Sequence, residues 1–390
     1  MASGSIEKRT QKDGTTRYRV VVWLPPSAGA GKPERKTGTF RTKKEAEATK
    51  NGWQVAADNG TGVKNTNITI TELCAMWLDV QRPALKPRTL MHYERTVKQQ
   101  IMEHIGALPV QRVQPATVDT LYALLRSKGY SEDAVHRVHQ RLMQVFTYAV
   151  KRRIVAVNPV LAVDAPTVRP GVPTMLDTAQ IGRFLTFAGA CGYSPLWLLL
   201  VQTGLRRGEA LGLRWQDVDL AVGKVHVQQT VECLGGKANI STPKTAAARR
   251  TITLFPESIA ALKAHRTRQL ARRLLAAEWE DHGLVFASAT GQPLNPNNVL
   301  RNFYMIVKKA NAKSEEDDDR DALLPAFTIH DLRHTHASHL LAAGWSIAVV
   351  SRRLGHASPA ITLGIYAHAL ADVPDGNLAT PAAFVFAGTA

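Results

Sequence analysis

Apolar and polar side chains alternate along residues 17–23, which is the period of a strand with one buried face. The alternation stops at Pro25 and Pro26, resumes over residues 35–40, and gives way at Thr42 to a pattern typical of a helix. The beginning of the chain therefore predicts a small sheet followed by one helix.

Beyond Gly60-Thr61-Gly62 the apolar positions recur at spacings of three and four residues, as Val135, Val138 and Leu142 illustrate. This period is typical of amphipathic helices. The expected helices cover residues 70–82, 87–105, 117–127 and 132–153. Together they predict an all-helical bundle of about a hundred residues, followed by an exposed linker over residues 165–171.

The remainder of the chain mixes the two periods. Helices are expected over residues 178–190 and 194–202, strands over 224–231 and 250–254, and further helices after them. Residues 315–319 are all acidic and predict a solvated loop. The fold class is thus multidomain α+β, with a small N-terminal β-sheet plus helix module, an all-helical domain, and a mixed, mainly helical domain with a small antiparallel sheet.

Composition narrows the choice of partner. The 390 residues are 45% hydrophobic, enough to bury two or three cores, and 49 Lys and Arg against 32 Asp and Glu give a net charge of +17. Such an excess favours a polyanion, most often nucleic acid, with a membrane surface as the alternative. No stretch of about 18 apolar residues and no signal peptide are evident, so we expect a cytoplasmic protein.

The three cysteines, Cys74, Cys191 and Cys233, lie far apart and form no CxxC pattern, so they are expected to be reduced and structural. The positive charge is densest at the start: residues 1–65 carry a net +7, from 13 basic and 6 acidic side chains. Phosphate contacts are expected from basic side chains in the first two segments, and the alternative is that they are merely solvated. The candidates are Arg17, Arg19, Lys43, Lys86, Arg88, Arg95 and Lys98.

Three short stretches carry the residues that could take part in chemistry. The first opens with Thr203-Gly204 and continues with leucines at helical spacing, so Arg206 lies near a helix start, where free N–H groups attract a phosphate. The alternative is that Arg206 pairs with Glu209 on the same turn.

The second stretch begins a helix at Thr328, with His330 and Arg333 three residues apart on one face. Histidines at 330, 334, 336 and 339 cluster there, which raises the alternative of a metal site. The cluster has no carboxylate or thiolate at a metal-binding spacing, so we expect no metal.

The third stretch is a helix over residues 346–354 that ends at Gly355 and is followed at once by His356. Ser358-Pro359 then begins a last helix that carries Tyr366. A lone His or Tyr here would ordinarily be structural, and only the order of the three stretches suggests otherwise.

This order, Arg, then His-x-x-Arg, then Gly-His, then Tyr ten residues later, resembles the signature of the tyrosine recombinases, the phage-integrase family of DNA strand-exchange enzymes. The matching stretches are residues 203–215, 328–341 and 354–370. The order of the segments is similar to that of the larger integrases. The resemblance implies an arm-type DNA-binding module over 1–64, a core-site-binding domain over 66–165 and a catalytic domain with a C-terminal tail over 173–390.

The resemblance also directs attention to a basic residue on a β-hairpin. Lys244, within Ser241-Thr242-Pro243-Lys244-Thr245, matches that position, and Lys237 is the runner-up. The catalytic residues implied in this way are Arg206, Lys244, His330, Arg333, His356 and Tyr366.

Each implied role follows the needs of a phosphodiester. Two arginines would hold the nonbridging oxygens, Tyr366 would attack phosphorus, His330 would accept the tyrosine proton, Lys244 would protonate the leaving oxygen, and His356 would add a hydrogen bond. Neither a metal nor another cofactor is expected.

The partners implied are double-stranded DNA at core and arm sites, further copies of the chain in a tetramer, and accessory DNA-bending or directionality proteins. The enzyme would integrate or excise a mobile element. The rival functions are a non-catalytic DNA-binding regulator, a type IB topoisomerase-like enzyme and a metal nuclease. The apolar tail over residues 371–390 is expected to dock on a neighbouring copy or on its own domain.

Overall fold

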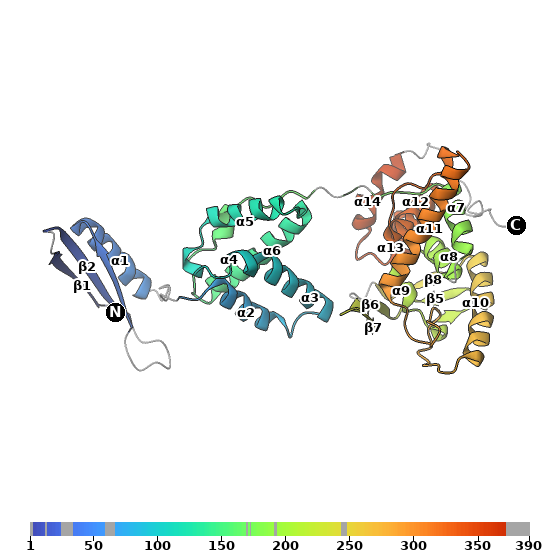
Figure 1. Cartoon of the computed structure of the whole chain (residues 1–390), viewed down its shortest axis with the longest axis horizontal. Helices are drawn as coiled ribbons and strands as arrows, with labels where there is room; N and C mark the ends of the chain where they lie inside the picture. The colour runs from blue at the N-terminus through green and yellow to red at the C-terminus, as the bar shows by residue number, and fades with distance from the viewer. Residues whose placement is uncertain are drawn as a thin grey trace. The chain divides into compact units, whose positions relative to one another are not determined.

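The computed structural model describes residues 3–11, 14–24, 34–58, 67–168, 171, 173–190, 193–242 and 248–371 (Figure 1). The chain divides into two compact units, Met1–Pro170 and Gly171–Ala390. Three features of the sequence analysis lie outside the described residues: the hinge at Gly60-Thr61-Gly62, the lysine at position 244, and the tail beyond residue 371.

The first unit begins with an antiparallel sheet in the order β1-β2-β3, formed by β1 (Ser3–Thr10), β2 (Thr16–Leu24) and β3 (Glu34–Phe40), and α1 (Lys43–Asp58) follows. Val20 and Val22 of β2 pack against Ala46 of α1 and form the centre of a small core. The sequence did not predict β1, because Ile6 is the single large apolar side chain in it.

A separate all-helical bundle follows, with its own core around residues such as Trp77, Leu121 and Phe146. Its helices are α2 (Ile70–Gln81), α3 (Pro87–Thr96), α4 (Glu103–Ile105), α5 (Pro115–Ser127) and α6 (Glu132–Lys151). The helix expected over residues 87–105 is present, but it passes through a π-helical turn, Val97–Met102, between α3 and α4.

The second unit is mainly helical, with a large core in which Phe184, Trp197 and Phe303 pack together and a smaller core that includes Leu340 and Tyr366. Its helices are α7 (Thr178–Gly189), α8 (Ser194–Thr203), α9 (Arg207–Leu211), α10 (Pro256–Leu275), α11 (Pro296–Glu316), α12 (Ile329–Ala342), α13 (Ile347–Leu354) and α14 (Pro359–Ala371).

Two small antiparallel sheets complete the second unit. One is β4 (Val218–Asp219), β5 (Lys224–His226) and β8 (Thr251–Thr253), and the other is the hairpin of β6 (Thr230–Leu234) and β7 (Lys237–Ser241). The single strand expected over residues 224–231 is therefore wrong, because the chain changes sheets between β5 and β6. The predicted fold class, multidomain α+β with small antiparallel sheets, is confirmed.

The acidic loop expected over residues 315–319 is only partly a loop. Helix α11 continues to Glu316, and Lys313 pairs with both Glu316 and Asp317 at the end of that helix. These i,i+3 and i,i+4 pairs favour one more helical turn than composition alone indicates. Within the described ranges, no helix is both long and apolar enough to cross a membrane.

Candidate active site

Arg206 is placed by a sharp turn at the end of α8. Gly204 caps that helix in the left-handed conformation, with φ of +64°, and a Cβ built on it would lie 2.7 Å from Cδ2 of His336. Both the conformation and the space require glycine. The chain therefore leaves α8 in a fixed direction and presents Arg206 at the first turn of α9.

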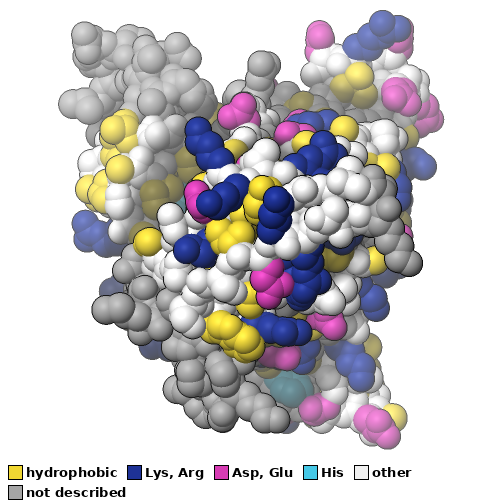
Figure 2. Space-filling view, turned by 90° about the vertical axis from the view of Figure 1, so that its left-hand side faces the viewer, with side chains coloured by type: hydrophobic (Ala, Val, Ile, Leu, Met, Phe, Trp, Pro, Cys, Tyr) yellow, Lys and Arg dark blue, Asp and Glu magenta, His cyan; other side chains and the backbone are white. Residues whose placement is uncertain are grey.

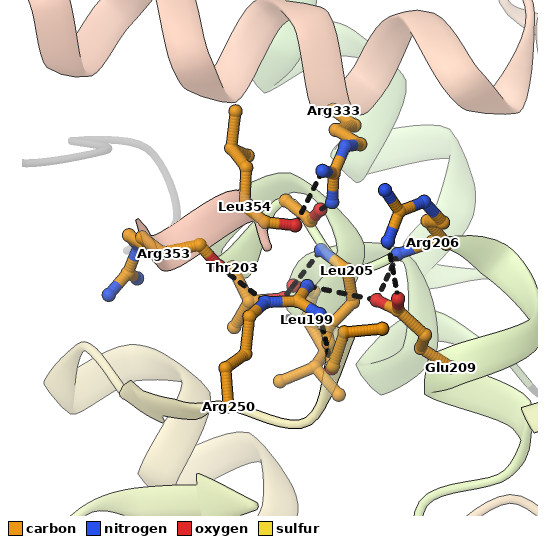
Figure 3. A network of polar contacts seen from close by, with 11 residues as sticks. Leu199, Thr203, Leu205, Arg206, Glu209, Arg250, Arg333, Arg353 and Leu354 are labelled. Carbon is orange, nitrogen blue, oxygen red and sulfur yellow. Dashed lines mark hydrogen bonds and ion pairs between the residues drawn. The ribbon is translucent and has the colours of Figure 1, made fainter. Parts of the chain in front are cut away.

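A buried carboxylate fixes the position of Arg206. Nη1 and the backbone N–H of Arg206 donate to Glu209 at 2.7 and 3.0 Å, and Nη2 of Arg250 donates to the same carboxylate at 2.9 Å (Figure 3). Burial alone would raise the pKa of Glu209, but the charges of Arg250 and Arg206 lower it below its usual value. The pairing with Glu209 that sequence raised as an alternative is therefore present, yet the Arg206 side chain stays 40% exposed.

Arg333 joins three segments of the unit. It lies on α12, whose first turn is closed by reciprocal hydrogen bonds between Thr328 and Asp331. Its guanidinium is 2% exposed and donates to the carbonyl oxygens of Gly204 at 2.7 Å and Leu354 at 2.5 Å (Figure 3). Burial, with the charges of Arg206 and Arg250, lowers the pKa of Arg333 to about 9.

His356 follows α13, which ends at Gly355 in the left-handed conformation with φ of +70°. Nδ1 of His356 forms a hydrogen bond of 2.8 Å with Oγ1 of Thr362 on α14. Partial burial and the charges of Arg333 and Arg206 lower the pKa of His356 to about 4, so its ring is neutral near pH 7. Because the charges of Arg333 and Arg206 act on His356, the segment Gly355-His356 lies near these two arginine side chains.

Tyr366 is fully buried on α14, and its hydroxyl forms a hydrogen bond of 2.7 Å with Nδ1 of His334 on α12. The residue His330 is exposed overall, while one face of its ring is covered by His334, which it meets edge to face with centroids 4.8 Å apart. Burial and the neighbouring His334, Arg333 and Arg206 lower the pKa of His330 to about 4. Among the described residues, the hydrogen bond of the Tyr366 hydroxyl thus goes to His334, and His330 lies next to it.

The other histidines of the α12 cluster are structural. Nε2 of His336 accepts a hydrogen bond of 3.0 Å from Nε of Arg353, and His339 forms one of 2.7 Å with the carbonyl of Leu176. In the part of the chain that the structure describes, no group of three His, Cys, Asp or Glu side chains is arranged to hold a metal ion.

The basic residue expected on a hairpin is not located. Lys244 lies outside the described residues, just beyond β7. Lys237, the runner-up, is exposed at the start of β7, opposite Leu234 in the β6-β7 hairpin. The assignment of Lys244 stays a prediction.

The N-terminal DNA-binding candidates lie on different faces. Val20 and Val22 face α1, and because side chains alternate along a strand, Arg17 and Arg19 face the opposite side of the sheet. The register places two more arginines on that outer face, Arg9 opposite Arg17 and Arg35 opposite Trp23. Lys43 begins α1 instead and pairs with Glu47 at 3.6 Å, so it does not join this cluster. Figure 2 shows Lys and Arg side chains on this view interspersed with Asp and Glu and with neutral and hydrophobic side chains.

The candidates of the helical bundle lie along one stretch of chain. Lys86 caps α3, Arg88 and Arg95 lie on it two turns apart, and Lys98 follows in the π-helical turn. Their side chains are exposed or partly exposed, and Arg95 donates to Gln99 at 3.1 Å.

Three residues of the site were not predicted from the sequence: Arg250, Arg353 and His334. Arg250 and Arg353 follow no motif, and only the folded structure shows that they connect β8, α8 and α13. His334 was noted solely as a possible metal ligand. The sequence did offer a signal for it, because His330 and His334 are four residues apart and share a helix face.

Comparisons with known proteins agree with this geometry. The family described as "Phage integrase family" matches residues 174–372, and "Phage integrase central domain" matches residues 71–165. A "Tyrosine recombinase XerC-like" protein of Caldanaerobacter subterraneus subsp. tengcongensis is 29% identical over 382 residues, covering 92% of this chain and 94% of that protein. The "Transposase from transposon Tn916" of Enterococcus faecalis is 27% identical over 327 residues, covering 80% of this chain and 77% of that protein.

Solved structures are similar as well. The integrase of the Tn1549 transposon (residues 82–397 of that protein), in complex with circular intermediate DNA, is 25% identical, with a TM-score of 0.65 over 77% of this chain and 95% of that one. A lambda integrase dimer bound to a core site has the same fold at 16% identity, with a TM-score of 0.57 over 92% of this chain and 93% of that one.

Proposed function

The chain belongs to the phage integrase family of site-specific DNA recombinases, which break and rejoin DNA during the movement of mobile elements, and from this premise we propose how its own residues perform the reaction. In the proposal, Tyr366 attacks the scissile phosphate, and Arg206, Arg333, His330, His356 and Lys244 surround it. The product is a 3′-phosphotyrosyl link with a free 5′-hydroxyl.

One observation carries the proposal: buried arginine contacts draw distant segments together around Tyr366. Arg333 donates to the carbonyls of Gly204 and Leu354, so it ties α12 both to the turn before Arg206 and to the turn before His356. The helix of Arg333 also supplies the histidine that contacts Tyr366. Tyr366 thus lies against His334 and within the electrostatic reach of Arg333, which a purely structural tyrosine would not need.

The arrangement suits phosphoryl transfer. An oxygen nucleophile attacking a phosphodiester passes through an anionic state, which preorganised cations stabilise. A guanidinium stays charged near neutral pH and can donate two parallel hydrogen bonds to phosphate oxygens. Arg206 is partly exposed and is therefore more accessible to an incoming phosphate than Arg333. The buried Arg333 adds a fixed positive charge to the site.

Proton transfer completes the proposed cycle. Lys244 protonates the departing 5′ oxygen, and the Tyr366 proton passes to a base on α12. His330, the acceptor expected from the resemblance, neighbours Tyr366 through the ring of His334. The phosphotyrosyl bond keeps the energy of the broken phosphodiester, so another strand can be joined without ATP.

We also propose the division of labour along the chain. Residues 1–64 bind arm-type sites through the outer face of the sheet, residues 66–165 grip the core site, and residues 173–390 cleave it. The DNA complexes of the Tn1549 and lambda integrases support DNA binding and assembly into oligomers. A tetramer on DNA, and accessory DNA-bending or directionality proteins, are the finer parts of this proposal.

Trapping the covalent adduct tests the proposal. On a nicked suicide substrate, which loses the strand needed for rejoining, the unaltered protein should form an adduct visible on a denaturing gel. Tyr366→Phe should abolish this adduct while DNA affinity stays nearly unchanged, because the hydroxyl contributes little to ground-state binding.

The same assay gives two controls. Cleavage should persist in EDTA, because arginine and lysine side chains supply the positive charge. An adduct that persists in Tyr366→Phe would place the nucleophile elsewhere, and a loss on chelation that Mg²⁺ restores would contradict the metal-free mechanism.

A further inference from the structure

The hydroxyl of Tyr366 contacts a histidine to which the family resemblance assigns no role. Nδ1 of His334 lies 2.7 Å from the tyrosine oxygen, and the centroids of the two rings are 5.6 Å apart. The phenol is fully buried, whereas His334 is partly buried, one helical turn beyond His330. The nucleophile of the proposed reaction is therefore already paired with a base in the DNA-free protein.

The surroundings of His334 keep it neutral. Burial lowers its pKa first, Asp331 partly offsets this, and Arg333 lowers it further. His330 faces its ring from the same helix, and Tyr366 from α14, while His356 lies within electrostatic reach. A neutral imidazole with the proton on Nε2 has a free lone pair on Nδ1, which can accept the hydrogen bond of the tyrosine O–H.

His330 occupies a different position. The residue is exposed, and the charges of both Arg333 and Arg206 act on it, which suits a position beside the bound phosphate. The described structure gives His330 a ring contact with His334 and no hydrogen bond to Tyr366. A histidine beside the phosphate, such as His330, is suited to donate a hydrogen bond to a phosphate oxygen. A histidine in contact with the phenol, such as His334, is suited to accept the phenol's proton.

We propose that His334 is the catalytic base that accepts the proton of Tyr366. This step rests on the proposed function. As the tyrosine oxygen forms its bond to phosphorus, its proton passes to Nδ1 of His334, the bond from phosphorus to the 5′ oxygen breaks, and that oxygen takes a proton from Lys244. Rejoining reverses each transfer, so His334 returns the proton to the departing tyrosine.

The phenol requires such help. Burial raises the pKa of Tyr366 to about 12, although Arg333 lowers it in part. At pH 7 only about one molecule in 10⁵ would then carry a free phenolate. A base at hydrogen-bond distance removes the proton during the attack, and this form of catalysis typically contributes about 10²- to 10⁴-fold.

Single-turnover cleavage with two substrates tests the role. The first is the normal suicide substrate, and the second carries a 5′-bridging sulfur at the scissile position, whose thiolate leaves without a proton. His334→Asn keeps an acceptor near the Nδ1 position but cannot take a proton, so it should slow cleavage by about 10²- to 10⁴-fold on both substrates. Lys244→Ala should be slow on the first substrate and regain rate on the second.

The pH profile on the sulfur substrate separates a base from a structural residue. The unaltered protein should show a level rate between pH 7 and 9, because His334 is already neutral there. In His334→Asn the reaction must use the rare phenolate, so the rate should rise about tenfold per pH unit. His330→Asn is the matched control and should be slower with a level profile. His334→Gln repeats the measurement with a second side chain, and DNA affinity and circular dichroism confirm that each variant is folded.

Several results would overturn the proposal. A His334→Asn rate within a few-fold of the unaltered protein would remove the base, and a slow rate with a level profile would make His334 structural. A rising profile in His330→Asn alone would assign the proton to His330. If the unaltered protein forms no Tyr366 adduct, the proposed function itself fails, which is a distinct outcome.

Discussion

The histidines of the site differ from ordinary surface histidines in one respect, which is that the folded protein keeps them uncharged. Burial and nearby arginines lower the pKa of His356 and His330 to about 4, and burial lowers that of His334 as well. In an unfolded chain the pKa of histidine is about 6.5. Between these values the unfolded chain binds more protons than the folded one, so the folded state loses stability as the pH falls.

A pH dependence of folding follows from this difference. The free energy of unfolding, measured by urea denaturation, should decrease as the pH is lowered from about 6.5 to 4, and His356→Asn should reduce that decrease. Asparagine cannot titrate, yet it can keep a hydrogen bond to Thr362. An unchanged slope in His356→Asn would mean that His356 is not held neutral.

At the level of elements, helices were predictable and short strands were not. The helices of the bundle carry three or more turns of apolar spacing, and capping pairs such as Thr69 with Glu72 mark their starts. Residues 224–231 are rich in β-formers, but β5 pairs with β8 while β6 pairs with β7. A change of partner leaves no trace in periodicity, because both strands favour the same side-chain types.

The site likewise combines residues that local sequence spacing predicts with contacts that it does not. Arg206, Arg333, His356 and Tyr366 could be proposed from the sequence because their local spacing matches a family signature. The contact of Tyr366 with His334 and the pairing of Arg250 with Glu209 depend on tertiary packing between α12 and α14 or between α9 and the chain before β8. Sequence spacing supplies the chemistry of the site, and long-range contacts supply its geometry.

The contribution of the buried Glu209–Arg250 ion pair to stability can be tested by substitution. Glu209 and Arg250 are each 5% exposed, and Arg250 also donates to the carbonyl of Arg353 at 2.6 Å, so it connects α9 with the end of α13. Arg250→Met should cost about 3 kcal/mol in the free energy of unfolding, because the buried carboxylate loses a partner. Adding Glu209→Gln should recover part of that loss.

Urea denaturation of the two single variants and the double variant measures the coupling. If the two charges are paired, the double variant should lose less unfolding free energy than the sum of the losses in the two single variants. If the two losses simply add, Arg250 and Glu209 act independently, and the pairing of these two charges would not stabilise the fold.

At the scale of the whole molecule, the described residues contain separate cores. The sheet and α1 pack around Val20 and Val22, the bundle packs around residues such as Phe146, and the second unit has its own large core around Trp197. No buried cluster is shared between the N-terminal sheet and the bundle within the described ranges. The sheet module should therefore be removable without unfolding the rest.

Removing the sheet module separates its role in DNA binding from catalysis. A chain that starts at Val63 lacks the outer-face arginines but retains every proposed catalytic residue, so it should still form the Tyr366 adduct on an isolated core-site oligonucleotide. On full attachment substrates it should fail or need far more protein, because two linked DNA-binding modules raise each other's effective concentration. The lost affinity should depend strongly on salt, since arginines that contact phosphates release counterions. Arg17→Gln with Arg19→Gln in the full chain should reproduce part of this loss. Full recombination by the truncated chain at ordinary concentrations would show that the module is only a basic appendage.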